Sequence, residues 1–270
     1  MTRKDAAKLI KRSLRINPPA VERKLVAFIK RKVRGAGSEG AVVGLSGGVD
    51  SSVVATLCKK ALRKINVLGI SMPEVGVTNP RDVADARYVA NTLGIRFKVV
   101  DITPVLLGIR KNLFDFRAKA RIPAANIRPR VRMTILYYYA NLLNRLVVGS
   151  SNRSELLAGY FTKHGDNAVD LMPLGYLYKT HVKQLAAHLN VPNRIIERVP
   201  SAGLWRGQTD ERELGLAYEK LDMIYAGLDL GLKPNSIADV AGVKIENVNR
   251  FIERKRRIAH KLSMPEIPEL

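Results

Sequence analysis

Two hydrophobic patterns alternate along the chain. Short apolar runs, each the length of a buried strand, occur at 41–45, 66–71, 96–100 and 146–149. Apolar residues recur every three or four positions at 49–63, 80–93 and 129–145, which predicts helices there, with a weaker helix from Pro104 and another opening at 150–155. Strands that alternate with helices in this way form parallel sheets from βαβ units. The pattern therefore predicts an α/β fold with a doubly wound, mainly parallel sheet.

The pattern becomes purely helical toward both ends of the chain. Basic amphipathic helices are predicted at 2–16 and 19–34, and further helices at 178–189 and 214–228. Polar or irregular stretches predict loops at 115–127, 160–173 and 199–213. We expect one domain over 1–270, with N-terminal helices in 1–38, a nucleotide-binding core in 39–215 and C-terminal helices in 216–270.

The first predicted strand ends in a glycine-rich turn. Ser46-Gly47-Gly48 lies between the apolar run and a helix that begins at Val49. Glycines let backbone N–H groups approach a ligand, and a helix start directs its free N–H groups and positive dipole end to the same point. A plain turn is the alternative, but serines and an aspartate accompany these glycines. The stretch predicts an anion site, most naturally for phosphate.

The two commonest phosphate-binding loops do not match this turn. A Walker loop requires GxxxxGK[ST], and no lysine follows these glycines. The GxGxxG fingerprint of dinucleotide-binding proteins is absent as well. The kind of phosphate site must therefore come from other motifs.

Composition limits the environment more than the partner. Lys and Arg total 46 against 24 acidic residues, a net charge of +22 that favours polyanionic partners but is also typical of a charge-rich heat-adapted surface. The only cysteine, Cys58, excludes an internal disulfide, and its place on an apolar-rich helix predicts a core position. No apolar run reaches the roughly 20 residues of a membrane helix. We expect a cytoplasmic protein without membrane contact.

Several motifs resemble those of one enzyme group. SGGVDSS, from Ser46, resembles the SGGxDS signature of the N-type ATP pyrophosphatases, which cleave ATP to AMP and pyrophosphate. With GSSNRSELLAGYFTKHGD, VDLMPLGYLYKT and PSAGLWRGQTDERELGLAYEKLD, the chain resembles the ammonia-dependent NAD synthetases from about Ala41 to Leu221. The resemblance implies a sheet of the adenine-nucleotide alpha-hydrolase type. It also implies a ligase: the carboxylate of deamido-NAD is adenylated by ATP, and ammonia then displaces AMP to give NAD.

The resemblance also implies the ATP and metal residues. The implied ATP-binding residues are Gly44, Leu45, Ser46, Gly47, Gly48, Val49, Asp50, Ser51, Ser150, Lys179 and Ser201. Asp50 and Glu155 match the Mg²⁺ positions, and each follows a predicted strand in the first turn of a helix, so we expect both to face one crevice. Lys179 matches a phosphate-contacting lysine that can offset charge on departing pyrophosphate. Taken alone, each is equally well a solvated or dipole-complementing helical residue.

The same resemblance implies that deamido-NAD is bound by Arg130, Lys163, Asp170, His260 and Lys261. Arg128 and Arg132 lie close enough to Arg130 to compete for its role, and Leu262 stands where the family usually has arginine. Asp166 is the implied catalytic residue of a matching mobile loop, where it and His164 would help to position ammonia. Free ammonia is the expected nitrogen source, because a glutaminase ordinarily needs an activated thiolate and the forty residues before the motif leave no space for an amidase domain.

Two alternatives remain beside this interpretation. Residues 236–250, with Gly242 at a turn and a basic second helix, have the pattern of a helix-turn-helix, which together with the charge suggests a nucleic-acid-binding protein. We favour a helical hairpin that packs Ile245, Val248 and Ile252 inward, and we do not expect nucleic acid as a partner. An RNA-modifying N-type ATP pyrophosphatase would use SGGVDSS, but it would not explain FTKHGD or SAGLW. The resemblance finally implies a homodimer, to which the tyrosine-rich helix at 137–139 would contribute.

Overall fold

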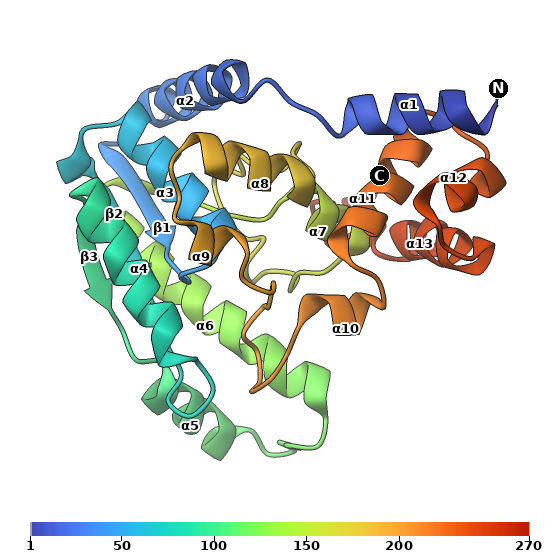
Figure 1. Cartoon of the computed structure of the whole chain (residues 1–270). Coiled ribbons are helices and arrows are strands. Elements are labelled where there is room, and N and C mark those ends of the chain that lie inside the picture. Colours follow the sequence, from blue (N-terminus) through green and yellow to red (C-terminus); the bar gives the residue numbers. More distant parts are fainter. Residues whose placement is uncertain (1, 270) are drawn as a thin grey trace.

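The computed structural model describes residues 2–269 (Figure 1). Within that range, four strands form one sheet in the order β3-β2-β1-β4, and every neighbouring pair is parallel. The strands are β1 (Gly40–Gly44), β2 (Val67–Ser71), β3 (Arg96–Val99) and β4 (Arg145–Val148). Val42 of β1 pairs with Leu68 on one side and Val147 on the other. The predicted α/β fold with a parallel sheet is confirmed.

The strand order places a topological switch at the centre of the sheet. The chain moves outward from β1 to β2 and β3, and then returns to the other side of β1 to form β4. In sheets wound in two directions, ligands bind beyond the carboxyl ends of the strands where the direction reverses. Here that point lies between β1 and β4, so the loops that leave these two strands border the expected crevice.

Helices cover both faces of the sheet (Figure 1). One face carries α2 (Pro18–Gly35), α3 (Val49–Ala61), α4 (Pro80–Leu93) and α8 (Lys179–His188), and the other carries α5 (Thr103–Asn112) and α6 (Arg121–Leu142). Successive side chains of a strand point to opposite faces, so Val43 packs under α3 and its neighbours while Val42 packs under α6. Each fully buried valine contributes about 2 kcal/mol.

A third hydrophobic cluster lies beside the sheet and joins the two ends of the chain. It is formed by α1 (Arg3–Ser13), α7 (Arg153–Ala158), α11 (Tyr218–Asp229), α12 (Pro234–Ala241) and α13 (Ile245–Arg257). The α12–α13 hairpin turns at Gly242, which has φ 61°, and buries Val248 and Phe251 completely. Ile245 and Ile252 are partly buried at its edge. The predicted hairpin is therefore a packed part of this cluster.

Several predicted boundaries are wrong. The predicted loop at 115–127 contains the first turns of α6, and the helix predicted at 129–145 begins at Arg121 and ends at Leu142. Pro123 occupies the first turn, where a missing N–H costs nothing, and Pro129 is accommodated inside the helix. The predicted loop at 199–213 includes most of α10 (Asp210–Leu214), while α9 (Asn193–Ile196) is a short extra turn. Two 3-10 turns complete the chain, at Lys64–Asn66 and Ala259–Lys261.

Candidate active site

The loop after β1 has a shape that only glycine permits at its centre. Gly47 has φ +81°, and a Cβ there would lie 2.2 Å from the carbonyl oxygen of Asp82. The N–H of Gly48 donates to Ser46 Oγ at 3.3 Å, and Ser46 Oγ lies 3.1 Å from Ser51 Oγ. Gly48 begins α3 without a side-chain cap, so the first N–H groups of the helix remain available to an anion. The predicted anion loop therefore has a suitable geometry.

Two carboxylates meet beside this loop, one from each strand of the switch point. Asp50 lies in the first turn of α3, after β1, and Glu155 in the first turn of α7, after β4. The amide of Asn152 donates to Asp50 Oδ1 at 3.0 Å and to Glu155 Oε1 at 2.7 Å, so one fully buried side chain holds both. Asp50 and Glu155 therefore lie side by side, as expected for residues that follow neighbouring parallel strands.

The ammonium group of Lys179 lies between these carboxylates. Its Nζ donates to Asp50 Oδ2 and to Glu155 Oε1, the latter at 3.4 Å, and the residue is only 3% exposed. Burial disfavours the charge, but Asp50 and Glu155 outweigh it and raise the pKa of Lys179. Burial raises the pKa of Glu155, against the attraction of Lys179. The interpretation of Lys179 as a solvated lysine at a helix start is therefore wrong.

A buried aspartate fixes the helix start that presents Lys179. Asp222 of α11 accepts from the backbone N–H of Thr180 at 2.8 Å and from its hydroxyl at 2.6 Å, and it also accepts from Ser154 Oγ. Ser154 Oγ in turn accepts from the N–H of Lys179 at 2.9 Å. The starts of α7 and α8 are thus tied to α11, which holds Lys179 against the Asp50–Glu155 pair.

A second group of predicted residues surrounds the loop at 159–166. Arg130 donates from Nε and Nη2 to the carbonyl oxygen of Lys163 at 3.3 and 3.2 Å. Lys261 donates to the carbonyl oxygens of Gly159 and Phe161 at 2.7 and 2.5 Å. Asp166 accepts from the N–H of Thr162 at 2.9 Å, and burial raises its pKa. Arg130 and Lys261 therefore support this loop from its two sides.

Asp170 and Tyr137 lie beside β4 at the edge of the sheet. Asp170 Oδ2 accepts from the N–H of Val147 within β4 at 2.7 Å, and Oδ1 accepts from the Tyr137 hydroxyl at 3.1 Å. Asp170 and Tyr137 line a cavity of about 350 Å³ at the outer edge of the sheet. The other lining residues are Ser38, Ala140, Asn141, Asn144, Arg145 and Leu146. His260 is exposed near the C-terminus. Among residues 2–269, neither of the side chains of Asp170 and His260 hydrogen-bonds to Asp50, Glu155 or Lys179.

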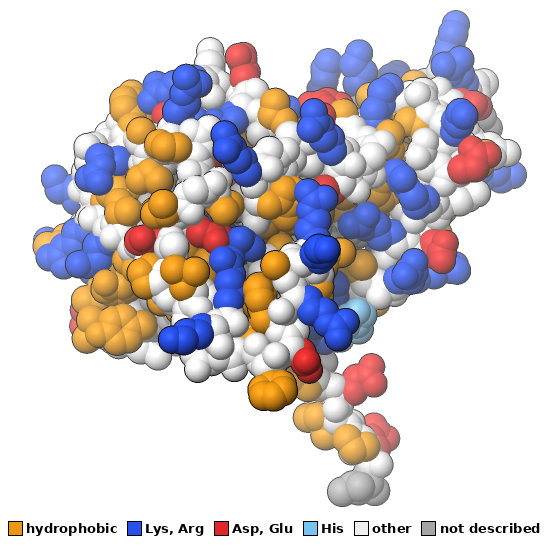
Figure 2. All heavy atoms as spheres, turned by 90° about the horizontal axis from the view of Figure 1, so that it is seen from below, with side chains coloured by type: hydrophobic (Ala, Val, Ile, Leu, Met, Phe, Trp, Pro, Cys, Tyr) orange, Lys and Arg blue, Asp and Glu red, His pale blue; other side chains and the backbone are white. Residues whose placement is uncertain are grey.

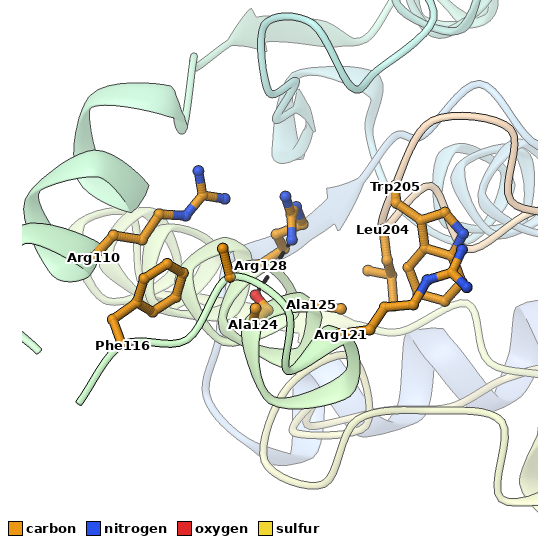
Figure 3. A pocket seen from close by; sticks show the side chains of 9 residues that line it. Arg110, Phe116, Arg121, Ala124, Ala125, Arg128, Leu204 and Trp205 are labelled. Atoms are coloured by element: carbon orange, nitrogen blue, oxygen red, sulfur yellow. Dashed lines mark hydrogen bonds between the residues drawn. The ribbon is translucent and has the colours of Figure 1, made fainter.

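The loop at 199–209 lines a second cavity through Leu204 and Trp205. Ser201 is exposed, and its Oγ accepts from the N–H of Gly203 at 3.1 Å, whereas Ser150 is half-buried directly after β4. Trp205 stacks against the guanidinium of Arg121, 4.1 Å from the ring centroid, at the start of α6. Figure 3 shows the cavity of about 260 Å³ that Trp205, Leu204 and Arg121 border on one side and Arg110 and Phe116 on the other.

The buried Glu74 forms ion pairs with Arg110 and Arg128, two arginines that line this cavity. Glu74, which is 4% exposed, accepts from Arg110 Nη2 at 2.9 Å and from Arg128 Nη2 at 3.1 Å, with a further bond from Arg128 Nε. Arg132 is half-buried and donates to the carbonyl oxygen of Met72 at 3.1 Å, and desolvation of its guanidinium lowers its pKa to about 10. Arg128 and Arg132 therefore have structural partners, which leaves Arg130 as the exposed arginine of the three.

Sequence reasoning missed three residues of the cluster. Asn152 stands three residues before Glu155, and this capping-box spacing is a local signal that could have identified it. Asp210 lies where a loop was predicted, and its partner Tyr218 lies in the next helix, with its ring 5.1 Å from Lys179 Nζ. Neither residue has a local signal, because the fold alone brings them to Lys179.

The outer surface is basic. The face in Figure 2 shows Lys and Arg side chains spread over it with far fewer Asp and Glu among them. Among residues 2–269, no helix has the length and apolar character needed to cross a bilayer. The acidic Asp50 cluster thus lies inside a chain that carries a net charge of +22.

Together, the doubly wound sheet, the glycine loop at its switch point and the buried lysine–carboxylate cluster define a nucleotide-binding α/β enzyme of the kind that handles phosphates. A family model described as NAD synthase matches residues 21–265. The chain belongs to the NAD synthase family.

Individual relatives agree with this assignment. The chain is 47% identical over 248 residues to an NH(3)-dependent NAD(+) synthetase of Methanocaldococcus jannaschii, covering 92% of this chain and 95% of the relative. Among solved structures, it resembles NMN synthetase from Francisella tularensis, with a TM-score of 0.84, 32% identity and coverage of 95% and 100%. It also resembles NH3-dependent NAD synthetase from Campylobacter jejuni, with a TM-score of 0.78, 32% identity and coverage of 94% and 100%. The fold and family expected from the sequence are confirmed.

Proposed function

We propose that this protein amidates deamido-NAD to NAD with ammonia and ATP, releasing AMP and pyrophosphate. The observation that carries the proposal is the cluster of Asp50, Glu155 and Lys179 beside the glycine loop at the switch point. An RNA-modifying enzyme or a DNA-binding protein would not need the remaining family motifs. The relatives named above are described as synthetases of NAD or NMN, which supports the same chemistry.

ATP would bind with its phosphates over the loop after β1. The start of α3 has no side-chain cap, and the hydroxyls of Ser46 and Ser51 lie 3.1 Å apart in the loop that precedes it. Ser150 at the end of β4 and Ser201 on the facing loop supply further hydroxyls. Lys179 would stabilise negative charge that develops on the departing pyrophosphate, which is the largest electrostatic demand of the step.

Asp50 and Glu155 would hold the magnesium ion of bound ATP. Both have an oxygen bonded to the same ammonium nitrogen, so a single cation can contact both carboxylates. Within the described residues, no group of three or more His, Cys, Asp or Glu side chains could hold a metal alone, but Mg²⁺ typically takes one or two carboxylates and completes its shell with phosphates and water. Bound magnesium would neutralise phosphate charge and orient the α-phosphorus.

Deamido-NAD would lie along α6. Arg130 donates to the 159–166 loop at Lys163, and Tyr137 with Asp170 lines the cavity at the sheet edge. On the same helix, Tyr138 and Leu142 are each 63% exposed, an apolar surface suited to a second copy of the chain. We infer a homodimer in which the substrate binds near that contact, with His260 and Lys261 closing the nicotinate end.

Ammonia would reach the adenylate from the 159–166 loop. Asp166 is tied to this loop, and a raised pKa suits a carboxylate that accepts a proton from ammonium. A glutaminase nucleophile is not evident in the described chain, because Cys58 is fully buried and burial raises its pKa to about 12. A single buried thiol also fits a reducing compartment, so we expect a cytoplasmic enzyme.

The decisive experiment incubates the protein with ATP, magnesium, deamido-NAD and ammonium, and measures the products. We expect NAD, AMP and pyrophosphate to form in equal amounts. A parallel reaction replaces deamido-NAD by nicotinate mononucleotide, because one structural neighbour is named an NMN synthetase. A third replaces ammonium by ammonium-free glutamine. Preferential product from the mononucleotide or from glutamine would refute the corresponding part of the proposal.

A further inference from the structure

A buried carboxylate next to Lys179 has no part in the chemistry described above. Asp210 is 4% exposed in the first turn of α10. Its Oδ2 accepts from the Tyr218 hydroxyl at 3.0 Å, whereas its Oδ1 is buried and finds no donor among residues 2–269. A buried polar atom without a partner costs about 1–3 kcal/mol, so a donor is expected to reach Oδ1 at some stage of the reaction.

Lys179 is the cation placed to supply that donor. The Tyr218 ring lies 5.1 Å from Lys179 Nζ, and the hydroxyl of the same ring binds Asp210. Burial raises the pKa of Asp210, and attraction to Lys179 is the strongest effect that opposes the rise. An ammonium group has three donors, of which Asp50 and Glu155 take two.

The charges around Lys179 indicate when the contact forms. Three carboxylates, of Asp50, Glu155 and Asp210, share one ammonium group, so the cluster lacks two positive charges, the charge of one divalent cation. If magnesium takes the two carboxylate oxygens that now bind Lys179, the ammonium group needs another acceptor. The remaining carboxylate oxygen in its surroundings is Oδ1 of Asp210.

We propose that Asp210 is the positioning residue for Lys179: when Asp50 and Glu155 ligate the magnesium of bound ATP, the ammonium group moves onto Asp210 Oδ1 and is held toward the phosphates. This inference rests on the proposed function, since it assumes that MgATP binds here. Tyr218 fixes Oδ2 and thereby presents Oδ1. The N–H of Asp210 also donates to the carbonyl oxygen of Pro200 at 3.0 Å, so the loop that carries Ser201 is tied to the same residue.

The first test is independent of the amide-forming reaction. A crystal structure with magnesium and a non-hydrolysable ATP analogue is expected to show Lys179 Nζ within about 3.2 Å of Asp210 Oδ1. If Nζ remains on Asp50 and Oδ1 remains unpaired in that complex, the inference is wrong. This measurement stands even if the enzyme makes no NAD, an outcome that would remove only the proposed substrate.

The second test compares Asp210→Asn with the matched control Glu211→Gln on the same helical turn. Asp210→Asn should lower the single-turnover rate of pyrophosphate formation about ten- to a hundredfold, because a misplaced catalytic group is costly, with the KM for deamido-NAD unchanged. Glu211→Gln should leave both unchanged. Equal pyrophosphate rates for the two variants would refute the role of Asp210.

A double-mutant cycle separates positioning from folding. In a Lys179→Ala background, Asp210→Asn should cause no further loss of rate, because its effect acts through that lysine. A second full loss in this background would contradict the inference. Should Asp210→Asn lower the melting temperature strongly, Tyr218→Phe takes its place in the same cycle, since it keeps the ring and releases only Oδ2.

Discussion

Replacing Gly47 by alanine tests whether the shape of the loop after β1 controls nucleotide binding. The φ of +81° costs an alanine about 1–2 kcal/mol, and the new Cβ would lie 2.2 Å from the Asp82 carbonyl oxygen, more than 1 Å inside ordinary contact. Relieving that overlap must move the loop or the start of α4, at a further 1–3 kcal/mol typical of overpacking. We expect about 2–5 kcal/mol of lost stability in total.

Gly231→Ala is the matched control. Gly231 has a similar φ of +69°, but a Cβ there meets nothing within 4 Å, so only the backbone cost of about 1–2 kcal/mol remains. Urea denaturation measures the two free energies of unfolding, and a single-turnover assay measures pyrophosphate release. Because Gly47 also accepts from Arg198 Nη1 at 3.3 Å, we expect its replacement to slow release about a hundredfold and Gly231→Ala to leave the rate unchanged. Equal losses of stability and rate in both variants would refute the steric argument.

Three further predictions concern the chemistry. Asp50→Asn should lower kcat/KM at least about a hundredfold, and near-normal turnover at limiting magnesium would exclude the metal role. Tyr137→Phe should raise the KM for deamido-NAD about fivefold, the scale of one lost hydrogen bond, without changing the KM for ATP, and the reverse pattern would place the dinucleotide elsewhere. Cys58→Ser should not affect ammonium-driven synthesis. The native thiol should resist alkylation at pH 8, because burial raises its pKa to about 12. Loss of glutamine-driven NAD formation in the Cys58→Ser variant would show that the thiol is a nucleophile.

The parts of the fold that the sequence predicts are those with local causes. The run Ala41–Leu45 followed by Ser46-Gly47-Gly48 predicts a strand, a turn and a helix because period and glycine act within a few residues. The irregular pattern at 115–127 predicts a loop, yet α6 begins at Arg121, and its Arg128 is anchored on the buried Glu74. That anchor joins residues 54 positions apart, and no local pattern contains it.

The candidate site divides along the same line. Asp50 and Glu155 could be brought together by argument, because both follow strands and parallel strands end at one edge of the sheet. The buried state of Lys179 could not, because it depends on Asp222, Tyr218 and Asp210 from later helices. The partner of Asp170 was equally hidden, since it is a backbone N–H of β4, 23 positions away.

The position of α1 has a consequence for the order of synthesis. Ile10 and Leu14 are buried against α11 and α12, and Arg3 Nη2 donates to the carbonyl oxygen of Asp239 at 3.2 Å. The partners of α1 are therefore made roughly 200 residues after it, an interval of about 10–40 s at ordinary translation rates. During that interval its apolar stripe is open to other chains and to chaperones. Synthesis of α11 and α12, rather than completion of the sheet, is what supplies α1 with its packing partners.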